Sequence, residues 1–69
     1  MQDRLHIAGL TLLAQRPVGH SVAAIYADRS GRKIARLGCQ DVTQLITRFA
    51  DQPSEMLDWI EQFKYEGLI

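Results

Sequence analysis

The clearest pattern of hydrophobic positions lies in the second half of the chain. Five apolar residues recur there at the spacing of one helical face. They are Val42, Leu45, Ile46, Phe49 and Ala50. Asp41 is followed three residues later by Gln44, which resembles a capping box at a helix start. The pattern therefore predicts a helix over about residues 41–51.

A second helix is expected after Pro53, which interrupts the first. Ser54 supplies a capping oxygen, and Glu55 places a negative charge near the positive end of the helix dipole. The inner face of this helix comprises Met56, Trp59, Ile60 and Phe63, with Leu57 beside them. Gly67 is expected to end it, which predicts a helix over about residues 54–66 and places Phe49, Trp59 and Phe63 in the core.

The strongest turn signal is the run Asp28-Arg29-Ser30-Gly31. An aspartate at the first position of a type I turn accepts hydrogen bonds from the chain that follows, and a glycine three residues later suits the left-handed backbone of a bulge. Residues 21–27 and 33–37 flank the turn with β-branched or aromatic residues at intervals. These features predict a β-hairpin.

The N-terminal segment has two interpretations. Leucines fall on both faces of an alternating pattern between Leu10 and Gln15, and a turn-like run follows at residues 17–20. A helix from residue 5 to 13, capped by Asp3, would be weakened by Gly9. We favour a strand with a bend at Gly9.

The order of these elements predicts one α+β domain over residues 1–69. A small antiparallel three-stranded β-meander over about residues 5–38 would be followed by two α-helices packed on one face. The alternative is an all-α domain in which residues 5–16 and 32–38 are helical. A core of this size supplies little stability, so we expect a homodimer or a stably bound partner.

Composition bears on the cellular location of the protein. Cys39 is the single cysteine, so no intrachain disulfide can form, and a reducing, cytoplasmic location is the simpler interpretation. The apolar-leaning stretch of residues 7–14 is too short to span a bilayer, and we find no signal peptide. We expect no cofactor and no membrane partner.

The formal net charge of zero conceals two halves of opposite sign. Residues 1–40 carry six basic and two acidic side chains, a net charge of +4, and residues 41–69 carry two basic and six acidic ones, a net charge of −4. We expect an acidic protein-binding face of Asp51, Glu55, Asp58 and Glu61, and a basic hairpin surface of Arg29, Arg32, Lys33 and Arg36. The purely structural interpretation is that the two halves attract each other within the fold. A possible dimer patch comprises Tyr65, Leu68 and Ile69.

Residues suited to catalysis are few, so we expect no enzyme activity. Cys39 would form a thiolate pair only if the fold brought it to His6 or His20, and lone cysteines more often pack than react. The carboxylates of the second helix are more typical of a solvated outer face than of a metal site. No glycine-rich phosphate loop occurs in the sequence.

These observations favour a small non-catalytic regulator or inhibitor that binds a protein through its charged surfaces. Inhibitors from phages and other mobile elements are an analogy based on size and architecture alone. The alternative is a small DNA- or RNA-binding regulator that uses the basic hairpin. Residues 34–43 also resemble a helix-turn-helix, but their alanine-to-glycine spacing is one residue too short. A net charge of zero counts against broad phosphate binding.

Overall fold

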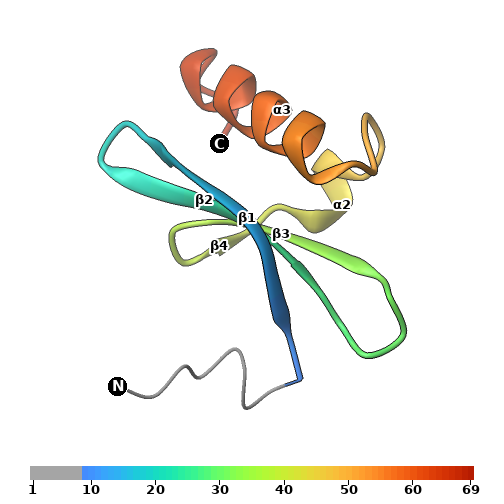
Figure 1. The fold of residues 1–69 in the computed structure, drawn as a ribbon. Coiled ribbons are helices and arrows are strands. Elements are labelled where there is room, and N and C mark those ends of the chain that lie inside the picture. Colours follow the sequence, from blue (N-terminus) through green and yellow to red (C-terminus); the bar gives the residue numbers. More distant parts are fainter. Residues whose placement is uncertain (1–8) are drawn as a thin grey trace.

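Two layers make up the fold, a twisted antiparallel sheet and a helical layer that lies on one of its faces (Figure 1). The computed structural model describes residues 9–69. The strands follow one another in chain order: β1 (Thr11–Val18), β2 (Ser21–Ala27), β3 (Lys33–Leu37) and β4 (Gln40–Asp41). The helices are α2 (Thr43–Ile46) and α3 (Pro53–Tyr65). The α+β prediction is confirmed, and the all-α alternative is wrong.

The hairpin between β2 and β3 forms as its sequence predicts. Asp28 Oδ1 accepts hydrogen bonds from the amides of Ser30 and Arg32 at 3.0 and 2.9 Å. The Ser30 hydroxyl donates to the same oxygen at 2.7 Å. These hydrogen bonds lower the pKa of Asp28, with the Ser30 side chain as the largest cause. Gly31 has φ +88°, the left-handed conformation that this turn requires. With β3 running through residues 33–37, the segment that resembles a helix-turn-helix does not form one.

A bulge in β1 decides how the leucines of that strand are arranged. Leu12 pairs with Tyr26 and Ala14 pairs with Ile25, so Leu12 and Leu13 together oppose one residue of β2. The strand was predicted correctly from Thr11 onward, and it extends two residues past Arg16 to Val18. Gly9, where a bend is expected, has φ +84°. Residues 5–8 of the predicted strand lie outside the described residues.

A fourth strand and a short α2 replace part of the predicted helix over residues 41–51. Asp41 belongs to β4, and its Oδ1 accepts hydrogen bonds from the amide and hydroxyl of Thr43 at 2.9 and 2.6 Å. The Thr43 hydroxyl oxygen in turn accepts from the Ala35 amide at 2.9 Å. Asp41 and Thr43 therefore tie the chain to the edge of β3, and the predicted capping box with Gln44 does not form. After Ile46 the chain continues as turns.

The predicted bounds of the second helix are nearly correct, but its cap is not. Gln52 is the N-cap residue and Pro53 occupies the first turn, where the missing amide of proline costs nothing. Ser54 lies inside the helix, which has no side-chain cap hydrogen bond. Gly67 ends it as expected: its φ is +81°, and the amide of Leu68 bonds to the Phe63 carbonyl at 2.9 Å.

The core lies between α3 and one face of the sheet. α3 contributes Met56, Leu57, Ile60 and Phe63, α2 and its flank contribute Val42 and Ile46, and the strands contribute Val18, Ala23, Ile25, Ala35 and Leu37. Phe49 was predicted to be buried, but 48% of its surface is exposed. Its ring packs on Trp59 and Phe63, with centroids 4.7 and 5.2 Å away, because the turns after α2 bring it over the side of α3.

Ile60 tests this account of the core because its side chain is completely buried. We expect Ile60→Val to lower the free energy of unfolding by about 1 kcal/mol through the loss of one buried methylene group. Leu68→Ala, at a position that is 63% exposed, should change it by less than about 0.5 kcal/mol. Urea unfolding followed by the fluorescence of Trp59, the single tryptophan, measures both variants. Equal changes in the free energy of unfolding for the two variants would contradict the placement of Ile60 in the core.

Asp41 gives the fold a pH-dependent contact. The hydrogen bonds from Thr43 hold the pKa of Asp41 below its ordinary value of 3.8. A carboxyl group whose pKa is lowered by folding stabilises the folded state above that value, and the contribution is lost as the pH falls through the folded-state pKa. We therefore expect the stability difference between wild type and Asp41→Asn to be constant from pH 7 to 5 and to shrink below about pH 3.8. Urea titrations at each pH measure it, with Asp51→Asn, at an exposed position, as the matched control.

Candidate functional site

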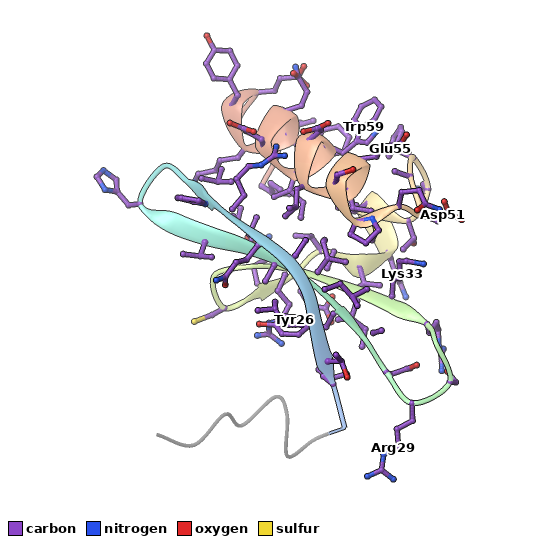
Figure 2. All side chains as sticks on the ribbon, in the orientation of Figure 1. Tyr26, Arg29, Lys33, Asp51, Glu55 and Trp59 are labelled. Atoms are coloured by element: carbon purple, nitrogen blue, oxygen red, sulfur yellow. The ribbon has the colours of Figure 1, made fainter. Side chains whose placement is uncertain are left out.

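The first candidate surface is the face of the sheet opposite the helices. Because side chains alternate along a strand, the neighbours of the core residues in β1, β2 and β3 lie on this face. Its residues, which we call the uncovered sheet face, are Leu12, Leu13, Gln15, Pro17, Val22, Ala24, Tyr26, Ile34 and Arg36. Figure 2 shows Tyr26 on this side of the sheet and Lys33 on the helical side. Both helices of residues 9–69 lie on the other face (Figure 1).

Large apolar side chains are exposed on the uncovered sheet face. Leu12 is 45% exposed, Leu13 42% and Val22 48%. Ala14, the next residue of β1, packs against the core. Without the bulge, strict alternation would direct one of the two leucines toward the helices. The bulge places both beside Tyr26 on the uncovered sheet face instead.

The free edge of β1 is poorly suited to pairing with another strand. The Gly38 amide donates to the Val22 carbonyl, so Val22 directs its backbone groups toward β3 and away from Pro17, its partner in β1. The ring nitrogen of Pro17 therefore faces the free edge, where it has no hydrogen to donate. The bulge at Leu12 and Leu13 interrupts the same edge. The uncovered sheet face, rather than this edge, is the accessible part of the sheet.

The centre of this face combines a small residue with polar ones. Gln15, Ala24 and Arg36 follow one another across β1, β2 and β3, and Asp41 of β4 comes next to Arg36. Ala24 is buried between its longer neighbours. The Arg36 guanidinium is held by a hydrogen bond of 3.1 Å to the Cys39 carbonyl. An anchored arginine among apolar side chains is a composition common at protein interfaces.

The predicted acidic face is divided by an ion pair within the fold. Arg16 of β1 donates from one nitrogen to Asp58 at 2.7 Å and to Glu61 at 2.9 Å. The hydrogen bond that Arg16 donates to Asp58 is the largest cause that raises the pKa of Arg16. Asp51 and Glu55 lie at the other end of α3, exposed beside Trp59, and make no ion pair within residues 9–69 (Figure 2). Two of the four predicted acidic residues, Asp58 and Glu61, thus pair with Arg16, which the predicted basic surface does not include.

The four residues of the predicted basic surface do not share one face. Arg29 and Arg32 are exposed at the hairpin tip, and Arg32 lies 3.6 Å from Asp28. Lys33 points toward the helical layer, and Arg36 belongs to the uncovered sheet face (Figure 2). The alternation of side chains along β3 separates Lys33 and Arg36.

The remaining predicted sites lie apart from one another. Tyr65 and Leu68 are 89% and 63% exposed, whereas Ile69 is partly buried against the core. The homodimer through this patch stays a prediction. Cys39 and His20 are exposed in two different turns, and His6 lies outside the described residues. Within residues 9–69, no three His, Cys, Asp or Glu side chains are close enough to hold a metal ion.

Three comparisons with known proteins were negative. No family model, curated protein or solved structure matches this chain. In the part of the chain that the structure describes, no helix is long and apolar enough to cross a membrane.

Reasoning from the sequence did not identify the uncovered sheet face as a site. Its one signal was the doublet Leu12-Leu13, which placed leucine on both faces of a regular strand. A bulge resolves that conflict, but a bulge is defined by the pairing of two strands. The pattern within one strand therefore could not locate it.

Proposed function

We propose that this chain is a non-catalytic protein-binding module that recognises its partner with the uncovered sheet face. The observation that carries the proposal is the bulge in β1, which directs Leu12 and Leu13 away from the core to a face where Val22 is also exposed. Exposed apolar side chains bordered by polar ones are typical of protein interaction sites.

The size of this face favours a reversible interaction. Three strands of about five residues each cover roughly 14 by 17 Å at ordinary strand spacing and rise. This area of about 240 Å² is well below the roughly 800 Å² that each partner buries in a standard interface, so we expect weak and transient binding. The proposal includes regulation or inhibition of the partner, which such binding allows. It also includes a cytoplasmic location.

The charges near this face favour a partner with an apolar patch bordered by carboxylates. Arg36 lies on the face, and Arg29 and Arg32 are exposed on the neighbouring hairpin. The nearby Asp28 lies 3.6 Å from Arg32, and Asp41 is the cross-strand neighbour of Arg36, so each carboxylate already has one arginine beside it and Arg29 is the excess charge. The positive charge is therefore the more available of the two for electrostatic recognition.

Photo-cross-linking in the native host tests the proposal. A photoreactive amino acid would replace Leu12, Val22 or Glu55 in separate variants, the last being the matched control on α3. We expect the first two to cross-link the same polypeptide and the third not to. Once that polypeptide is purified, Arg36→Glu should weaken its binding at least tenfold by calorimetry, because a like charge would face its carboxylates.

Two outcomes would refute this proposal. One is cross-linking only from Glu55, which would assign recognition to the helical layer. The other is unchanged affinity for both Arg36→Glu and Leu12→Ser in variants that keep the thermal unfolding curve of wild type.

Nucleic-acid binding is the second candidate, because Arg29 and Arg32 are both exposed at the hairpin tip. Binding to phosphates weakens steeply as salt rises. Because the four basic residues do not form one surface, we expect no binding tighter than about 10 µM to random duplex DNA in 150 mM salt. Gel shifts over a salt series measure this. Tight, salt-sensitive binding that Arg29→Glu with Arg32→Glu abolishes would favour the nucleic-acid function instead.

A further inference from the structure

A groove lies along the outer side of β3, at the end near the hairpin. Its volume is about 570 Å³, and its walls come from the hairpin and the start of β3, from β4 and the first three residues of α2, and from Ile69. We call it the β3 groove. It follows a strand edge and adjoins the uncovered sheet face at Ile34, which lines both.

The backbone of β3 is unpaired where it borders this groove. Along the edge away from β2, Leu37 pairs with Gln40, and the Ala35 amide and carbonyl bond to Thr43 and Val42. Lys33 has the same parity as Ala35 and Leu37, so its amide and carbonyl point to the same edge. Within residues 9–69 no segment pairs with Lys33 on that edge.

Two backbone hydrogen bonds confirm the alternation on the other edge of β3. The Arg32 carbonyl accepts from the Asp28 amide at 2.9 Å, and the Gly38 amide donates to the Val22 carbonyl at 2.9 Å. Even-numbered residues of this stretch therefore face β2, and the odd-numbered Lys33 faces the groove.

The charges of the groove favour an acidic ligand. Asp28 and Asp41 line it, but their carboxylates accept hydrogen bonds from the turn and from Thr43. Arg32 also lines the groove and lies 3.6 Å from Asp28. The Lys33 ammonium makes no ion pair within residues 9–69, so it is the cation available to a ligand. Leu45 and Ile69 add apolar wall beside it.

We propose that the β3 groove binds an extended peptide segment of another protein, which adds a short strand beside Lys33 and places a carboxylate side chain opposite it. The Lys33 amide and carbonyl supply two main-chain hydrogen bonds, as in other cases of strand addition to a sheet edge. A residue directly across from Lys33 places its side chain on the same side of the sheet, which pairs opposite charges. This inference does not depend on the proposed function of the uncovered sheet face.

Two-dimensional NMR of the isotope-labelled full chain provides the test. The probes are acetyl-Thr-Val-Glu-Val-Thr-amide and the same peptide with lysine in place of glutamate. We expect the glutamate peptide to shift the amide signals of Lys33, Leu45 and Ile69 and to bind about threefold more tightly or better than the lysine peptide. Amide signals of Leu12 and Val22, on the uncovered sheet face and farther from the groove, should not move.

Two variants separate the charge of Lys33 from its amide. Lys33→Gln should abolish the preference for glutamate over lysine. Lys33→Pro also removes the outward amide, and it should weaken both peptides by a further five- to tenfold. Proline is compatible with the first residue of a strand whose nitrogen points away from its neighbour. Arg29→Gln, at the hairpin tip, is the matched control and should leave both affinities unchanged.

The thermal unfolding curve, followed by Trp59 fluorescence, establishes that each variant is folded. The proposal is overturned if Lys33→Pro binds as well as Lys33→Gln, or if the glutamate preference survives Lys33→Gln. It is equally overturned if the peptide shifts only residues of the uncovered sheet face, or shifts none at millimolar peptide. Such results would leave the proposal for the uncovered sheet face standing, because they concern a different surface.

Discussion

The packing of α3 on one face of the sheet is the interaction on which the rest of the structure depends. Met56, Ile60 and Phe63 bury the inward residues of three strands, and the helical layer ends there. Within residues 9–69, no helix covers the other face of the sheet. In most such sheets the second face is polar. Here it carries Leu12, Leu13 and Val22, and that departure is the physical basis of the proposed function.

The two edges of the sheet differ in a way that follows from single residues. On β1, Pro17 removes a donor and the bulge interrupts the ladder, which are known protections against unwanted pairing. On β3, Thr43 uses its side chain to satisfy Ala35 and then leads the chain into α2. The chain turns away from the edge before it reaches Lys33. The start of β3 is thus left unpaired beside a groove, whereas the longer edge of β1 is poorly suited to strand pairing.

Charge contributes to the fold and to its surfaces in different places. Arg16 joins β1 to α3 through Asp58 and Glu61, so part of the attraction between the basic and acidic halves is used within the molecule. The arginines of the hairpin tip do not reach the helical carboxylates and stay exposed. Internal attraction therefore accounts for Arg16, Asp58 and Glu61, whereas a recognition role for the exposed arginines stays a prediction.

The sequence by itself determined the elements whose signals are local. The Asp28–Gly31 turn, the α3 helix with its end at Gly67, and the order of strands before helices all depend on neighbouring residues, so pattern and turn chemistry were sufficient. Only the tertiary structure decided the bulge at Leu12 and Leu13, the partners of Arg16, the exposure of Phe49 and the conversion of Asp41 into part of a strand. Each of these depends on contact between segments distant in the chain, and no local spacing encodes which segments meet.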